Sequence, residues 1–152
     1  MEEEILRAKK KAMSLLQHMD RTEWELRSKI EKAGFSEEAV GEAIEYVRSF
    51  HYIDDERYAI RFAEIYRESR SISRIRQDLQ KKHIPEEIIT LALEEIDYDD
   101  SAALKKAIDK LLKGQINEPS YEDRQKLIAK LYRKGFRVDQ IVKQLDISLQ
   151  KV

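Results

Sequence analysis

The sequence predicts an all-α fold, an elongated, curved array of about nine helices arranged as three tandem three-helix repeats. Three observations lead to this prediction. Apolar residues recur with the helical period along nearly the whole chain. Only four Gly and two Pro interrupt 152 residues, too few for the many tight turns of a β protein. Charged residues make up 39 %, a proportion that helices can place on solvated faces.

Local capping signals set the helix boundaries. Thr22 and Glu25 have the spacing of a capping box, in which each side chain bonds the other's backbone N–H. The other predicted helix starts carry a short polar residue or a proline: Ser36, Asp54 or Asp55, Ser71 or Ser73, Pro85, Asp99 or Asp100, and Ser120. The predicted helix ends are glycines that permit positive φ: Gly34, Gly114 and Gly135. A last helix is predicted from Val138 to Ile147. These signals delimit repeats over residues 1–53, 54–98 and 99–152.

An internal repeat follows from the apolar register of the second and third helices. Its positions in the first repeat are Leu26, Ile30, Phe35, Val40 and Ile44. They correspond to Ile75, Leu79, Ile84, Ile89 and Leu93, and to Leu127, Leu131, Phe136, Ile141 and Leu145. Gly34 corresponds to Gly135, and His83 takes this place in the second repeat. Amphipathic hairpins can align by chance, but uniformly apolar positions favour tandem units that share apolar surface.

Composition excludes several classes of protein. The chain has no cysteine, so disulfides, thiolate metal sites and cysteine nucleophiles are excluded, and a reducing cytoplasm is favoured. No apolar run approaches the roughly 20 residues that span a bilayer. The acidic start, Met1–Glu4, differs from that of a signal peptide. We therefore expect a cytoplasmic monomer that does not bind membranes.

No catalytic or metal-binding pattern emerges. His18, His51 and His83 lie far apart and lack the spacing of metal ligands on one helix face. The sequence has neither a phosphate-binding Gly-rich loop nor a G-x-S-x-G motif. The adjacent carboxylates of Asp54–Glu56 are explained by a helix start, where they cap the helix and complement its dipole. The sequence thus predicts a non-enzymatic protein with no catalytic residue, no metal and no cofactor.

Charge is distributed in blocks, although the formal net charge is only −1. Residues 57–82 contain eight basic and three acidic residues. Residues 86–100 contain seven acidic residues and no Lys or Arg, and residues 124–137 contain six basic residues and no acid. Two basic blocks in corresponding repeats indicate surfaces that face a polyanion, with contacts mainly to phosphate.

The basic blocks supply the candidate contacts. Lys126, Lys130, Arg133 and Arg137 would form one stripe if a single helix ran through them. The candidate nucleic-acid or filament contacts are Arg57, Arg61, Arg67, Arg70, Arg74, Arg76, Lys81, Lys82, Lys126, Lys130, Arg133, Lys134 and Arg137. Solvated faces with weak local ion pairs are the alternative interpretation.

Aromatic residues could add base stacking. Helical spacing predicts Trp24, Tyr52, Tyr58 and Tyr66 as core residues instead. Tyr132, beside a basic residue, is the better candidate for an exposed stacking side chain.

Four segments carry specific motifs. His51–Ala59 with Phe62 fits G-Y-[IL]-[DN]-D-x-x-[YF]-A-x-x-[FW], with histidine at the glycine. Arg21–Arg27 fits R-[ST]-x-x-E-L-R. Arg74–Ile84 is close to R-I-x-x-E-L-x-x-K-G-I, again with histidine at the glycine, and Leu131–Phe136 fits L-x-R-[RK]-G-F. Together these segments resemble the RecX family, and the similarity covers almost the whole chain.

The resemblance implies a fold and a partner. It implies three tandem three-helix units in a curved rod. It also implies binding to a RecA-type recombinase and its filament on single-stranded DNA. Such binding would usually inhibit filament growth, ATP hydrolysis and strand exchange in recombinational repair and the SOS response. Binding of single-stranded DNA itself is expected to be weak and independent of sequence. Inhibition and positive modulation both remain open.

Two other functions fit the residues alone. Gly34 and Gly135 lie between short helices, as in a helix-turn-helix transcriptional regulator. Such a regulator would bind duplex DNA selectively without a recombinase. A helical-repeat scaffold, in contrast, would show no salt-dependent affinity for single strands.

Overall fold

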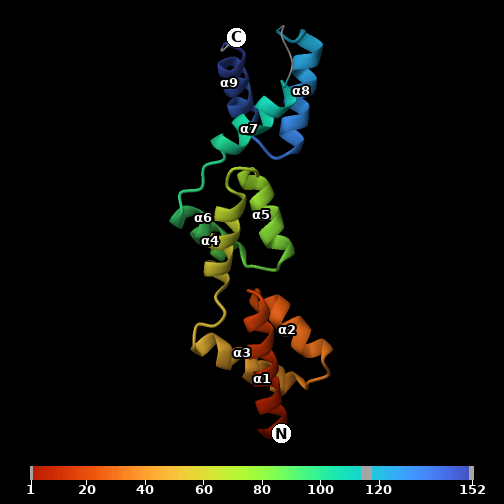
Figure 1. The fold of residues 1–152 in the computed structure, drawn as a ribbon, viewed down its shortest axis with the longest axis vertical. Coiled ribbons are helices and arrows are strands. Elements are labelled where there is room, and N and C mark those ends of the chain that lie inside the picture. The colour runs from red at the N-terminus through yellow and green to blue at the C-terminus, as the bar shows by residue number, and fades with distance from the viewer. Residues whose placement is uncertain (1, 114–117, 151–152) are drawn as a thin grey trace. The chain divides into compact units, whose positions relative to one another are not determined.

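A computed structural model describes residues 2–113 and 118–150, and over these ranges it contains nine α-helices and no strand (Figure 1). The helices are α1 (Glu2–His18), α2 (Glu23–Lys32), α3 (Glu37–Ser49), α4 (Asp55–Tyr66), α5 (Ile72–Lys81), α6 (Glu86–Glu95), α7 (Ser101–Leu111), α8 (Tyr121–Arg133) and α9 (Val138–Leu149). The all-α prediction is confirmed. The last helix continues past the predicted end at Ile147, and Gly114 lies outside the described residues.

Short polar side chains cap the helices at the predicted starts. The capping box of α2 is complete, because Thr22 Oγ1 and Glu25 Oε1 each accept the other residue's backbone N–H, at 3.1 and 3.3 Å. Where the sequence left two residues open, Asp54 caps α4 and Ser71 caps α5, accepting backbone N–H groups at 3.0 and 3.1 Å. Asp99 accepts the first N–H of α7 at 2.9 Å. These caps satisfy N–H groups that have no partner within the helix.

Several helices end in left-handed turns. Gly34 and Gly135 have φ of 95° and 100°, and His51, His83 and Asp97 have φ of 59°, 61° and 48°. The two histidines therefore adopt a left-handed conformation at the positions where the motifs of the resemblance carry glycine. A non-glycine residue in this region costs about 1–2 kcal/mol, because its Cβ approaches the following carbonyl oxygen.

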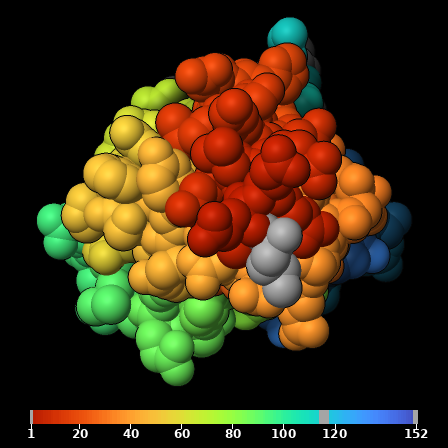
Figure 2. All heavy atoms as spheres, turned by 90° about the horizontal axis from the view of Figure 1, so that it is seen from below, coloured from red at the N-terminus to blue at the C-terminus, as the bar shows by residue number. Residues whose placement is uncertain are grey.

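The chain divides into two compact units. Unit 1 comprises Met1–Arg61 and Leu79–Ala92, and unit 2 comprises Phe62–Asp78 and Leu93–Val152, so the boundary crosses α4, α5 and α6. In unit 1, α1 packs against α2 and α3, and Figure 2 shows the red spheres of α1 lying against orange spheres of these helices. In unit 2, α7, α8 and α9 pack against one another. Each group of three helices encloses its own apolar core.

The predicted apolar register is the register of the cores. Of the fifteen predicted positions, thirteen are buried, and Phe35 and Leu127 are partly buried against the same cores. The small helix residues Ala8, Ala12 and Ala103 are buried as well, which lets neighbouring helices approach closely. The apolar pattern therefore predicted both the helices and the faces that they bury.

In unit 2, hydrogen bonds from Tyr98 hold the segment after α6 against the end of α4. Its hydroxyl donates to the backbone carbonyls of Arg70 at 2.9 Å and Tyr66 at 3.3 Å, and its side chain is buried. Burial, with the nearby Asp100 carboxylate, raises the pKa of Tyr98 from 10.0 to about 12. The folded protein therefore keeps this proton to higher pH than the unfolded chain does.

This pKa predicts a loss of stability at high pH. Between pH 10 and 12 the Tyr98 phenol is ionised in the unfolded chain but not in the folded protein. The stabilising contribution of this phenol to folding is therefore fully present below pH 10 and is lost by pH 12. We expect the free energy of unfolding, relative to Tyr98→Phe, to fall by about 2–3 kcal/mol over this window. Chemical denaturation of both proteins across the range measures it. A constant difference between the two proteins would contradict the prediction.

In unit 1, polar contacts join the start of α2 to two segments of the second repeat. Thr22 Oγ1 lies 3.4 Å from the carbonyl oxygen of Lys82, and the backbone N–H of Glu23 donates to Asp55 Oδ1 at 2.9 Å. Burial, together with the Asp54 carboxylate, raises the pKa of Asp55. We call these contacts the first joint. Asp55, at the start of its own helix, caps a helix of the preceding repeat.

Unit 2 contains the equivalent contacts at the start of α5. Ser71 Oγ donates to the carbonyl oxygen of Lys134 at 2.8 Å, and the backbone N–H of Ile72 donates to Asp100 Oδ2 at 2.9 Å. Ser71 and Asp100 are both buried. This second joint explains why Asp100 makes no side-chain cap for α7 although it directly precedes that helix.

The two joints differ in what packs beside the hydrogen bonds. In the first, the rings of Trp24 and His83 stack with centroids 3.9 Å apart and planes inclined by 16°. In the second, the corresponding residues are Ser73 and Gly135. A Cβ on Gly135 would be in hard contact with Ser71 Oγ and 3.0 Å from the Cβ of Ser73. The second joint therefore requires glycine both for its φ and for its lack of a side chain.

Candidate functional site

Helix α8 carries three predicted contacts that are exposed on one side of the helix. Lys126, Lys130 and Arg133 are exposed, and no ion pair links any of them to a carboxylate among the described residues. Their spacing along the helix places the three side chains on one side of α8. Tyr132 lies between them in sequence and is 62 % exposed, as predicted. This surface, which we call the α8 basic face, is free to meet a polyanion.

The predicted four-residue stripe is shorter than expected. Helix α8 ends at Arg133, and Arg137 is the N-cap residue of α9, where its guanidinium pairs with Asp139 at 3.2 Å. The stripe therefore loses its fourth member, because the chain turns at Gly135 before another helical turn is completed. Lys134 is the C-cap of α8, and its side chain is exposed.

Three arginines of the basic block at residues 57–82 bind other groups within unit 2. Arg67 donates to two backbone carbonyls just after α6, at 2.6 and 2.9 Å. Arg70 and Arg74 both bind the carboxylate of Asp78, at 2.6 and 3.0 Å, and the side chain of Asp78 is only 12 % exposed. The guanidinium of Arg70 also lies 3.6 Å from the ring centroid of Tyr66. These cations are partly neutralised within the fold and offer less charge to a partner than the α8 basic face.

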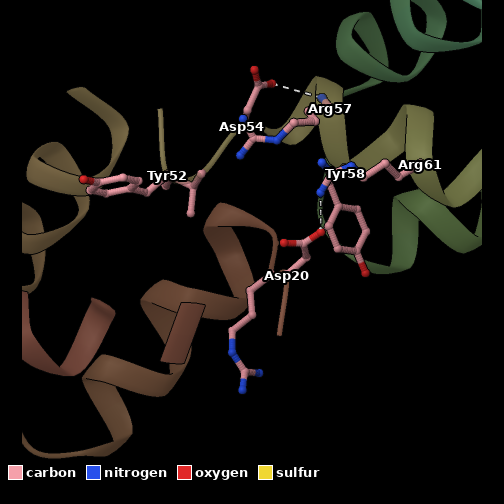
Figure 3. A pocket seen from close by; sticks show the side chains of 8 residues that line it. Asp20, Tyr52, Asp54, Arg57, Tyr58 and Arg61 are labelled. Atoms are coloured by element: carbon pink, nitrogen blue, oxygen red, sulfur yellow. Dashed lines mark hydrogen bonds and ion pairs between the residues drawn. The ribbon is translucent and has the colours of Figure 1, made fainter. Parts of the chain in front are cut away.

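In unit 1, Arg57 and Arg61 line one small recess together with two carboxylates (Figure 3). Arg61 Nη1 binds Asp20 Oδ2 at 2.7 Å, and Asp54 accepts the backbone N–H of Arg57 at 3.0 Å. The Arg57 guanidinium donates to the carbonyl oxygen of His51 at 3.1 Å. The structure thus brings these two arginines together, but in a nearly neutral setting.

The end of α5 supplies the remaining predicted cations. Lys81 is exposed and has no carboxylate partner among the described residues. Lys82 lies 3.8 Å from Glu25 and 5.5 Å from the ring centroid of Tyr58. Arg76 is half-buried. Lys81 is therefore the most available cation of this group.

The prediction that the aromatic residues are core residues is wrong for two of them. Trp24 is 46 % exposed and Tyr52 is 45 % exposed, whereas Tyr58 and Tyr66 are partly buried. Trp24 precedes the buried Leu26 by two residues, which places the two side chains on opposite sides of α2. The sequence contained this signal, since α2 has a polar side on which only Trp24 is large and apolar.

Exposed cations on α1 were also missed by the sequence analysis. Arg7, Lys10 and Lys11 are exposed, and Lys9 Nζ lies 4.9 Å from the ring centroid of Tyr46. The run from Arg7 to Lys11 contains four cations, which was a visible signal. Three glutamates precede the run, so the start of the chain carries little net charge.

Two negative findings limit the chemistry of the described residues. No group of three or more His, Asp or Glu side chains among them is arranged to hold a metal ion. No helix among them combines the length and apolar character needed to cross a bilayer. Helical repeats with an exposed basic face define a helical-repeat binding protein.

Comparison with known proteins identifies the family. Models of the first, second and third three-helix domains of RecX match residues 8–46, 54–93 and 97–145. The chain is 36 % identical over 146 residues to regulatory protein RecX of Caldanaerobacter subterraneus subsp. tengcongensis, covering 95 % of this chain and 72 % of that protein. It is 31 % identical to regulatory protein RecX of Clostridium perfringens, covering 91 % of this chain and 66 % of that protein. The chain belongs to the RecX family of regulatory proteins.

Solved structures agree with the fold. A crystal structure of RecX from Lactobacillus salivarius superposes with a TM-score of 0.83 at 24 % identity, over 97 % of this chain and 99 % of that one. A crystal structure of a regulatory protein RecX superposes with a TM-score of 0.82 at 26 % identity, over 94 % and 72 % of the two chains. The predicted family and the three-helix repeats are confirmed. RecX proteins are non-enzymatic regulators, which agrees with the predicted absence of catalysis.

Proposed function

We propose that this protein regulates a RecA-type recombinase by binding the filament that the recombinase forms on single-stranded DNA. Binding modulates filament growth, ATP hydrolysis and strand exchange in recombinational repair and the SOS response, and the protein acts as a cytoplasmic monomer. The observation that carries the proposal is the α8 basic face, with Lys126, Lys130 and Arg133 unpaired among the described residues and Tyr132 exposed. Membership of the RecX family supports the choice of partner.

The contacts proposed for this surface are mainly electrostatic. The ammonium and guanidinium groups of α8 meet phosphates, which a single-stranded filament presents regardless of sequence. The second joint holds the Lys134 backbone against Ser71, so the end of α8 adjoins the start of α5, where Arg74 is exposed. The acidic stretch Glu86–Asp100 is proposed to face basic surfaces of the recombinase. Association on this basis weakens as salt is raised.

The direct test is the recombinase ATPase on single-stranded DNA. We expect saturating protein to change the steady-state ATPase rate severalfold, and the concentration needed for half the effect to rise with salt. An ATPase rate that stays unchanged at saturation would refute the proposal. A separate pull-down of the recombinase, with and without single-stranded DNA, shows whether the filament or the free recombinase is the target.

A helix-turn-helix regulator is the competing function. The α8–α9 pair turns at Gly135, but its second helix carries one cation, Lys143, against the acidic Asp139 and Asp146. A recognition helix in a major groove also contacts phosphates through cations, and α9 carries no net positive charge. Tight, sequence-selective duplex binding in a gel-shift series without recombinase would favour this competitor over the proposal.

A further inference from the structure

The first joint contains an aromatic pair that neither the core nor the α8 basic face requires. Trp24 on α2 and His83 after α5 stack in nearly parallel planes with centroids 3.9 Å apart. Both side chains are exposed, and 46 % of Trp24 remains accessible. The imidazole lies against one face of the indole, and the pair as a whole leaves aromatic surface accessible to solvent.

The chain keeps this pair although the backbone would favour another residue. His83 has a φ of 61°, a conformation in which glycine is unstrained and which Gly135 supplies at the same place in the third repeat. In the second joint Ser73 and Gly135 occupy the corresponding positions, so this joint has no aromatic ring there. A joint of this kind therefore forms without the stack. Local strain retained where glycine would serve indicates a role beyond folding.

Two cations lie near the pair in sequence, and the two glutamates that flank Trp24 are paired with other residues. Lys81 precedes His83 by two residues, is exposed and has no carboxylate partner among the described residues. Arg27 follows Trp24 by one helical turn and shares its side of α2. Glu23 is paired with Arg48, and Glu25 with Lys82. Exposed aromatic rings with the exposed Lys81 and the partly buried Arg27 near them in sequence suit a base on the ring and phosphates beside it.

We propose that Trp24 and His83 form a stacking site for an unpaired base of single-stranded nucleic acid, with Lys81 and Arg27 binding the flanking phosphates. This site belongs to unit 1, whereas the α8 basic face belongs to unit 2. The inference rests on the proposed function for its biological setting, but it makes its own claim about free single strands. Stacking on a ring tolerates any base, so the site selects unpaired strands and not a sequence.

The test uses the fluorescence of Trp24, the single tryptophan of the chain. Titration of the whole chain with oligothymidylate at low salt is expected to quench its emission, because a stacked base lies directly on the indole. A duplex of the same length is expected to leave the emission unchanged. Unchanged emission at saturating oligothymidylate, or equal quenching by the duplex, would overturn the proposal.

Substitutions separate stacking from a purely structural role. In anisotropy titrations with labelled oligothymidylate, we expect Trp24→Leu to weaken binding about tenfold and Trp24→Phe to retain most of it. Phe50→Leu, at an equally exposed aromatic residue of unit 1 outside the joint, is the matched control and is expected to leave affinity unchanged. Equal losses for Trp24→Leu and Phe50→Leu would overturn the proposal.

The His83→Gly variant distinguishes a binding role of the Trp24–His83 stack from a role in stability alone. It relaxes the positive φ while removing the imidazole, so we expect weaker oligonucleotide binding with no loss in Tm. A lower Tm with unchanged binding would overturn the site. The ATPase assay keeps the two proposals apart. If the protein modulates the recombinase while Trp24 does not respond to oligothymidylate, the stacking site is refuted and the proposed function stands. If Trp24 responds to oligothymidylate while the recombinase ATPase is unchanged, only the proposed function is refuted.

Discussion

Replacing Gly135 by alanine is expected to lower the free energy of unfolding by about 3 kcal/mol. Two effects add. The residue has a φ of 100°, where a Cβ costs about 1–2 kcal/mol. The new methyl group would also be in hard contact with Ser71 Oγ, displacing a hydroxyl that bonds both Lys134 and the start of α5. Each lost hydrogen bond costs about 1 kcal/mol. Chemical denaturation followed by circular dichroism measures the change.

Two other glycines of the chain are matched controls. Gly34 has a φ of 95°, but a methyl group added there would meet nothing within 4 Å, so Gly34→Ala isolates the backbone cost of about 1–2 kcal/mol. Gly41 lies inside α3 with open space around it, and Gly41→Ala is expected to stabilise by about 0.5–1 kcal/mol. The double variant Gly135→Ala/Ser71→Ala should lose less free energy of unfolding than the sum of the two single variants, because the hydroxyl that the new methyl group contacts is absent. Similar losses at Gly34 and Gly135 would show that close packing at the second joint contributes nothing.

Neutralising Lys126, Lys130 and Arg133 to alanine is expected to weaken binding to the recombinase filament about 50-fold near 0.15 M salt. On single strands each phosphate contact contributes about 0.7 to the slope of log affinity against log salt, so the slope should become shallower by about 2. These side chains are exposed and unpaired among the described residues, so the fold loses no ion pair. Filament co-sedimentation at several salt concentrations measures both quantities.

The matched control removes the same charge from another helix of unit 2. Lys105, Lys106 and Lys110 on α7 are exposed, and their only carboxylate contact among the described residues is a 3.8 Å approach of Lys106 to the exposed Glu68. The triple alanine variant on α7 should lose only the small, general effect of net charge. If the α7 and α8 variants lose affinity equally, the α8 basic face is not the binding surface.

The helices and their buried faces could be predicted because they depend on neighbours in sequence. The period of the apolar residues defines a stripe on each helix, and a capping side chain acts within three residues. The register from Leu26 to Leu145 is accordingly the register of the cores. The four motif segments together indicated the family, which the three matching domain models confirm.

The availability of each candidate side chain could not be predicted in the same way. Arg67, Arg70 and Arg74 belong to a basic block in sequence, yet in the fold they bind carbonyls and a carboxylate. A charge count does not show which cations find partners, because an ion pair depends on distance in space. Trp24 was assigned to the core from helical spacing, although it lies on the side of α2 opposite the buried Leu26.

The sequence by itself determined where the helices lie, which faces they bury and which family the chain belongs to. Only the tertiary structure decided that Asp55 and Asp100 cap helices of the preceding repeat, 32 and 28 residues away. It also decided that Ser71 packs too closely against Gly135 for a side chain there, and that the rings of His83 and Trp24 stack at an exposed position. The physical reason is that local periodicity and capping act over a few residues, whereas these contacts join chain segments that only folding brings together.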